Sequence, residues 1–277
     1  FIEALNKSFI HHNKNCKKYK MWVKKFNYSK SNNIDDLKAF PFIPSSIFKK
    51  MDLVSTKKYD KKILSSGTST NVKSKIFLDK ENSKNQSIVL SKIMKEIIGE
   101  KRIPFLIVDT NPSENDNKSE ISARIAGLSG YLMSSSEQHF LLDKNLNLDI
   151  KYFKKLVDRY KKNKKEIIII GYTSIIFQKL LKNKMNIKFP KKTKLIHFGG
   201  WKKLKNIAIT KKKLNIKIKR YLGIQIDNIY DIYGFSEQLG TIYPSRGNRG
   251  CRVPAYSEII VRDTNSLEVL PNGKIGF

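Results

Sequence analysis

The chain has 277 residues, which is enough for one large domain or two closely associated subdomains around a sizeable core. Its formal net charge of +31 ordinarily favours nucleic acid or an anionic membrane surface as a partner. Because the excess is nearly all lysine, spread along the whole chain, we interpret it as solvated helix faces and loops and expect no nucleic-acid partner.

Apolar side chains between Phe1 and Phe26 recur at helical spacing among lysines and asparagines, which predicts amphipathic helices. Pro41 and Pro44 then force an extended segment. Ser45 or Ser46 follows directly, and we expect one of these two side chains to cap a short helix.

A run rich in serine and threonine extends from Ser65 to Lys73, just before strand-like residues 75–78. Gly67 lets the backbone approach an anion closely, and the hydroxyls with Lys73 can complete a phosphate cradle. A solvated hairpin loop has the same composition, and composition alone favours that second interpretation. Motifs farther along the chain have to decide between the two.

Runs of four to six apolar residues alternate with helical patterns through most of the remaining chain. The predicted strands lie at residues 105–109, 166–172 and 194–198, and the predicted helices at residues 79–98, 149–162 and 174–181. This alternation is typical of βαβ units and predicts an α/β fold with a mainly parallel sheet flanked by helices.

Ligands of such sheets bind at the carboxyl ends of the strands, so the loops found there are candidates for carrying chemistry. Besides Ser65–Lys73, two further loops qualify, Gly199–Trp201 and Ile232–Gly240. The last combines an aromatic residue that can stack on a base with a glycine turn, a hydroxyl and a carboxylate suited to Mg²⁺. Each pattern is commonplace alone, and the information lies in their combination.

Together and in this order, the loops resemble the motifs of the adenylate-forming enzyme superfamily. That superfamily has a phosphate loop of the form Ser-Gly-Thr-Thr-Gly-x-Pro-Lys, a glycine-rich adenine loop and a Tyr-Gly-x-Thr-Glu motif. The matching stretches here are Ser66–Lys73, Gly199–Lys202 and Tyr233–Glu237. With the Pro41–Lys49 segment, the branch that the chain most resembles is the LuxE acyl-protein synthetase family, from about Phe40 onward.

The resemblance implies an ATP site with Mg²⁺. It implies cofactor-binding roles for Ser65, Ser66, Gly67, Thr68, Ser69, Gly199, Gly200, Tyr233, Gly234 and Ser236. Lys73 and Glu237 are the implied catalytic residues, and Glu237 is also the implied metal ligand. Thr70 and Val72 stand where the family pattern has glycine and proline.

The activity implied by the resemblance is ATP-dependent activation of a carboxylic acid, such as a fatty acid, followed by transfer of the acyl group to a thiol. Proteins that donate acyl groups or reduce the product would be partners, as in the LuxE family. Residues 1–277 would form the large N-terminal domain, built of two subdomains, and a small C-terminal domain would follow beyond Phe277.

Two alternatives stay open. An acyl- or aryl-CoA ligase of the phenylacetate-CoA ligase type shares all three motifs and differs in its acceptor. A non-catalytic basic protein would instead bind nucleic acid or an acidic surface through its lysines, with a steep dependence on salt.

Cys16 and Cys251 are too few for a disulfide framework or a structural zinc site. No apolar run approaches the ~20 residues that span a bilayer, and no signal-peptide pattern opens the chain. We therefore expect a soluble, cytoplasmic protein without a membrane span. No base is evident near Cys251, and the family's acceptor cysteine would lie farther along, so we interpret Cys251 as structural.

Overall fold

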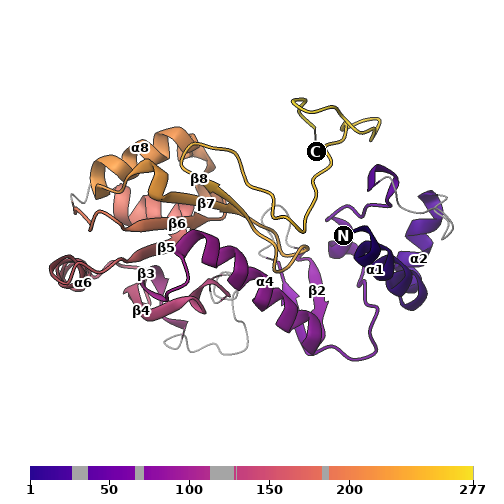
Figure 1. Cartoon of the computed structure of the whole chain (residues 1–277), viewed down its shortest axis with the longest axis horizontal. Helices are drawn as coiled ribbons and strands as arrows, with labels where there is room; N and C mark the ends of the chain where they lie inside the picture. The colour runs from indigo at the N-terminus through magenta and orange to yellow at the C-terminus, as the bar shows by residue number, and fades with distance from the viewer. Residues whose placement is uncertain (27–36, 66–71, 113–127, 129, 183–186, 277) are drawn as a thin grey trace. The chain divides into compact units, whose positions relative to one another are not determined.

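The computed structural model describes residues 1–26, 37–65, 72–112, 128, 130–182 and 187–276, which include all the labelled elements of Figure 1. The chain divides into two compact units. The first comprises Phe1–Ser83 and Val253–Phe277, and the second comprises Lys84–Arg252. Among the helices of these described residues, none combines the length and the apolar composition that crossing a bilayer requires.

Short helices dominate the first unit. They are α1 (Ile2–Asn15), α2 (Lys17–Val23), η1 (Lys24–Phe26), η2 (Leu37–Ala39) and α3 (Ile47–Lys50). The apolar faces of α1 and α2 meet in a small buried cluster, where the rings of Phe9 and Tyr19 lie edge to face with centroids 6.2 Å apart. The amphipathic helices predicted for this region are thus confirmed.

Helix α3 begins directly after Ser46, but the expectation of a serine side-chain cap is wrong, because no side-chain hydrogen bond caps this helix. A capping residue needs extended backbone angles, whereas Ser46 already has helical ones (φ −60°, ψ −22°). The backbone supplies the missing acceptor instead, since the Ile47 N–H donates to the Pro44 carbonyl at 3.0 Å.

The first unit also contains a two-stranded antiparallel hairpin of β1 (Lys61–Leu64) and β2 (Lys75–Leu78). Leu64 pairs with Lys75, so the serine- and threonine-rich run is the connection between the two strands.

A six-stranded sheet forms the centre of the second unit, in the order β4-β3-β5-β6-β7-β8. Its strands are β3 (Ile103–Thr110), β4 (Ser135–Leu142), β5 (Ile168–Tyr172), β6 (Lys194–Phe198), β7 (Ile229–Tyr233) and β8 (Tyr243–Arg246). All neighbouring pairs are parallel except β7 and β8. The predicted mainly parallel sheet is therefore confirmed.

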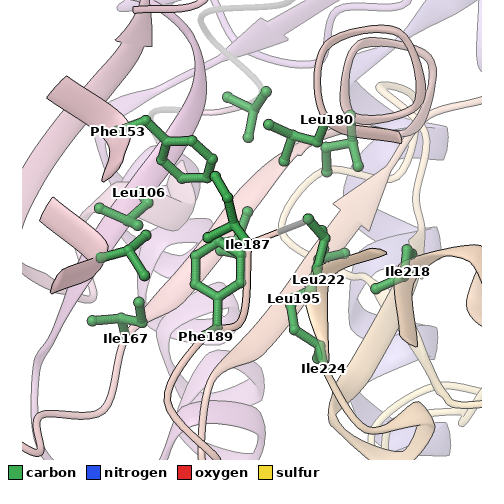
Figure 2. Close-up of a cluster of buried hydrophobic side chains, with 14 of the residues drawn as sticks. Leu106, Phe153, Ile167, Leu180, Ile187, Phe189, Leu195, Ile218, Leu222 and Ile224 are labelled. Atoms are coloured by element: carbon green, nitrogen blue, oxygen red, sulfur yellow. The ribbon is translucent and has the colours of Figure 1, made fainter. Parts of the chain in front are cut away.

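Helices cover both faces of this sheet, as Figure 1 shows for α4 and α8. The helices described for this part of the chain are α4 (Lys80–Ile98), α6 (Ile150–Lys162), α7 (Thr173–Ile176), the π-helix η4 (Phe177–Leu181), η5 (Lys202–Ile207), α8 (Lys211–Leu222) and η6 (Ile226–Asn228). The apolar end of α4 packs on one face, and α6 and α8 pack on the other. Buried apolar side chains form a cluster between the sheet and helices α6 and α8. Figure 2 shows this cluster, with Phe153 of α6, Leu195 of β6 and Leu222 of α8 among its side chains.

Candidate functional site

The predicted phosphate loop is closed at its base by two serines. The Ser65 N–H donates to the Ser74 carbonyl at 3.0 Å, and the Ser74 N–H donates to Ser65 Oγ at 2.8 Å. Ser66–Asn71 lie outside the described residues, so the roles of Ser66, Gly67, Thr68 and Ser69 stay predictions. At the loop's far end Lys73 is exposed, and it makes no ion pair within the described part of the chain.

A glycine turn follows β6 in the second unit. Gly199 has a φ of +70°, the left-handed region that glycine adopts without strain. A Cβ atom at Gly199 would lie 2.9 Å from Tyr172 Cδ1, which is closer than real contacts, whereas one at Gly200 would meet nothing within 4 Å. The sequence therefore needs glycine at the first of these two positions for both backbone and packing reasons.

The Tyr-Gly segment begins at Tyr233, the last residue of β7, which is the next strand of the sheet. Phe198 pairs with Ile232 in parallel register, so the Gly199 turn and Tyr233 emerge at the same edge. Tyr233 is 59% exposed, and its ring lies 5.9 Å from the ring of Phe235. A large exposed ring beside a glycine turn can serve as a packing surface for a planar base.

Glu237 lies in a tight turn after Tyr233, where the Gln238 N–H donates to the Phe235 carbonyl at 3.2 Å. The Tyr243 hydroxyl anchors this turn by donating to Gln238 Oε1 at 2.9 Å. Glu237 is half-buried, and its carboxylate has no hydrogen bond or ion pair with any described residue. The segment thus holds its backbone in place while leaving the carboxylate available.

The carboxylate of Glu237 is a type of ligand that Mg²⁺ uses in nucleotide sites. Mg²⁺ in nucleotide sites takes one or two carboxylates and fills its other positions with phosphate oxygens and water. A single available carboxylate at Glu237 meets that requirement. The described residues contain no group of three or more His, Cys, Asp or Glu side chains that could hold a metal ion by themselves.

A polar cluster beneath the glycine turn was not predicted from the sequence. His197 Nδ1 lies 2.9 Å from Thr173 Oγ1 and 3.6 Å from Asp231 Oδ1. Burial lowers the pKa of His197, the Asp231 carboxylate acts in the opposite direction, and the Lys211 ammonium lowers the pKa further. The imidazole is therefore neutral near pH 7. A polar residue in each of the apolar strands β6 and β7 was the signal that could have indicated this cluster.

Cys251 lies at the end of the same cluster. Its backbone forms an isolated antiparallel β-bridge with Ser245 of β8, and Ser245 pairs with Asp231 of β7. Partial burial and the Asp231 carboxylate raise the pKa of the Cys251 thiol, against a smaller opposite effect of Lys211. The view that no base lies nearby was thus incomplete. A raised pKa still keeps the sulfur protonated and a poor nucleophile.

The solved structures that match the chain include a CoA ligase and an adenylation domain. One is a benzoate CoA ligase from Burkholderia xenovorans LB400, with 15% identity over 70% of this chain and 36% of that chain and a TM-score of 0.44. The other is the adenylation domain of a keto acid-selecting NRPS module bound to keto acyl adenylate, with 11% identity over 76% of this chain and 41% of that chain and a TM-score of 0.43. The chain thus spans less than half the length of either protein.

Sequence comparison gives two results. No match is found among curated proteins. The family model described as acyl-protein synthetase, LuxE, matches residues 1–277, which is the whole length of the sequence. This chain belongs to the LuxE acyl-protein synthetase family.

Proposed function

We propose that the chain is the large, nucleotide-binding domain of an ATP-dependent, AMP-forming ligase that activates a carboxylic acid, and a long-chain fatty acid in particular. The observation that carries the proposal is the pair of turns after β6 and β7, which lie side by side at the carboxyl edge of a parallel sheet. Ligands of doubly wound sheets bind at this edge. Membership of the LuxE family supports the class of reaction.

In this proposal the turns bind the nucleoside. The adenine packs on the exposed face of Tyr233, and backbone groups of Gly199 and Gly200 contact its edge. Gly234 keeps the turn compact beside the base, and the Ser236 hydroxyl donates to the α-phosphate. Each role uses a group that is exposed or half-exposed at this edge of the sheet.

The remaining phosphates are assigned in the same proposal to the serine- and threonine-rich run and Lys73. The backbone of Ser65–Ser69 surrounds the β- and γ-phosphates, and Lys73 places its ammonium against the charge that develops on pyrophosphate. Glu237 is the proposed Mg²⁺ ligand, and the bound ion would neutralise the charge of the phosphates during the reaction.

The substrate carboxylate attacks the α-phosphorus, which forms the acyl-adenylate and breaks the bond to pyrophosphate. A thiol then attacks the activated carbonyl and releases AMP, so that a thioester replaces the mixed anhydride. We propose that this thiol belongs to the enzyme outside residues 1–277, as in the LuxE family. Cys16 is buried, and the raised pKa of Cys251 disfavours its thiolate. Proteins that supply the acid or reduce the thioester are the proposed partners.

Carboxylate-dependent exchange of labelled pyrophosphate into ATP tests this proposal directly. We expect exchange with the 277-residue chain for at least one member of a series of acids that differ in chain length. Exchange and ATP binding that are both absent with every acid would exclude adenylation.

The acceptor is tested separately with a longer version of the protein. Label from the acid that stays on the protein supports an acyl-protein synthetase, whereas label on added CoA indicates a CoA ligase. Salt-sensitive binding to DNA without any binding of ATP would indicate a basic binding protein instead.

A further inference from the structure

A row of non-apolar residues crosses the face of the sheet that α6 and α8 cover. His197 of β6 lies opposite Gly171 of β5 and Asp231 of β7. The residues two positions earlier in these strands point to the same face and belong to the buried apolar cluster: Ile169, Leu195 and Ile229. The sheet therefore changes from apolar to polar just before its carboxyl edge.

The directions of the hydrogen bonds in this row follow from the chemistry of the groups. Thr173 Oγ1 lies 3.2 Å from the Phe198 carbonyl oxygen and 2.9 Å from His197 Nδ1. A carbonyl oxygen only accepts, so the single hydroxyl proton of Thr173 goes to Phe198. The hydroxyl must then accept from His197, which places the imidazole proton on Nδ1.

Burial makes this arrangement rigid. His197 is 2% exposed and Thr173 is 6% exposed. The second ring nitrogen, Nε2, is buried without a hydrogen-bond partner among the described residues. Among the described residues, the imidazole therefore makes its polar contacts on the side of Thr173 and Asp231. Breaking a hydrogen bond there is costly, because the site is buried and water cannot replace the lost partner.

The two hydrogen bonds form a relay from His197 through Thr173 to the carbonyl of Phe198. Phe198 is the last residue before the glycine turn. The ring of Phe198 is itself fixed between Tyr172 and Tyr131, with centroid distances of 4.6 and 5.0 Å. We propose that His197 and Thr173 are positioning residues, which hold the Phe198 carbonyl and thereby set the position of the Gly199 turn against the nucleotide. This inference rests on the proposed function, because it assigns the turn to the nucleotide site.

Removing the Thr173 hydroxyl tests the relay. Thr173→Val keeps the shape of the side chain and removes both hydrogen bonds. We expect the KM for ATP in pyrophosphate exchange to rise about five- to tenfold, with kcat nearly unchanged, because a base-binding turn contributes equally to ground-state and transition-state binding. Thr173→Ser restores the hydroxyl and should restore the KM.

Thr193→Val is the matched control. Thr193 is 1% exposed, its hydroxyl has no partner among the described residues, and it precedes the opposite end of β6. The same chemical change there should leave the KM for ATP unchanged. A similar rise in KM in both valine variants would attribute the effect to general loosening of the sheet and overturn the inference.

Two variants of His197 separate positioning from simple packing. His197→Asn carries an N–H donor at the position of Nδ1, whereas His197→Gln carries it one bond farther, at the position of Nε2. Asparagine removes more volume and should destabilise the unit more. We nevertheless expect His197→Asn to keep the wild-type KM for ATP and His197→Gln to raise it.

The possible failures are distinguishable. Wild-type protein that neither binds ATP nor exchanges pyrophosphate would overturn the proposed function and this inference together. Wild-type protein that is active, with unchanged KM for ATP in Thr173→Val and in His197→Gln, would overturn the inference alone. Thermal unfolding of each variant shows whether it is folded, and the two histidine variants decide the question should Thr173→Val fail to fold.

Discussion

Gly199→Ala is the substitution whose cost the structure specifies most closely. The φ of +70° at this position costs about 1–2 kcal/mol for a residue with a Cβ atom. That atom would also lie 2.9 Å from Tyr172 Cδ1. The Tyr172 ring packs against Phe198 and cannot move away freely, so displacing it adds about 0.5–1.5 kcal/mol. We expect the free energy of unfolding of the second unit to fall by about 2–3 kcal/mol.

Gly200→Ala is the control on the adjacent residue. It has no positive φ, and an added Cβ atom meets nothing within 4 Å. Alanine there should leave stability unchanged or raise it by up to about 1 kcal/mol through the unfolded state. Urea denaturation followed by far-UV circular dichroism measures both variants. Equal midpoints for the two would refute the reasoning, because they would show that neither the backbone angle nor the Tyr172 contact constrains Gly199.

Three further predictions concern the nucleotide site and its support. Glu237→Gln should lower pyrophosphate exchange by about 10²–10³-fold, with partial recovery at high Mg²⁺ concentration, because the carboxylate charge is lost while the size is kept. Tyr233→Ala should weaken ATP binding by about 1–3 kcal/mol through lost stacking, and Tyr233→Phe should not. The lowered pKa of His197 means that the unfolded state binds more protons than the folded state as the pH falls through 6.5, so the second unit should lose stability as the pH falls below that value.

Each of these predictions has a result that contradicts it. Superimposable plots of exchange against Mg²⁺ for wild type and Glu237→Gln would remove this carboxylate from the metal site. Equal ATP affinity in the alanine and phenylalanine variants of Tyr233 would remove the ring from the base site. For His197, chemical denaturation between pH 5 and 7 should show a steeper loss of stability in wild type than in His197→Asn, and parallel profiles would contradict the assigned cause.

The parts of the fold with strong local patterns could be predicted from the sequence. The apolar runs of β3, β5 and β6 are long enough to identify buried strands without knowledge of their neighbours. Helix α6 begins where the sequence predicts, because Asp149 caps it by accepting from the Tyr152 N–H. These elements carry their own signals, and the parallel sheet followed from their alternation.

Other elements have weak local patterns. Strand β4 is an edge strand with polar side chains facing outward, and β8 is four residues long and contains Pro244, so neither reads as a strand in isolation. The lysines of α8 conceal its apolar stripe of Leu214, Ile218 and Leu222. For such elements the neighbouring strand or the sheet face supplies the stabilisation that the local sequence lacks.

The residues of the candidate site also divide into those with a recognisable local pattern and those that depend on the neighbouring strands. Its glycines and the Tyr233 segment are recognisable because a turn or an exposed ring needs particular residue types. The cluster of Thr173, His197 and Asp231 depends on the order β5-β6-β7 and on a register that no single segment encodes. Predicted strands alone could not bring these side chains together.

The position of this polar row in the sheet argues for a role beyond stability. Burying an imidazole and a hydroxyl costs desolvation free energy, and an apolar pair of similar volume would pack against α8 without that cost. One ring nitrogen of His197 also lacks a partner among the described residues, which adds to the cost. Such departures from good packing are expected where geometry matters more than stability. In this sheet His197 lies two residues before Gly199, and the Phe198 carbonyl that Thr173 holds directly precedes the turn for which we propose a base contact.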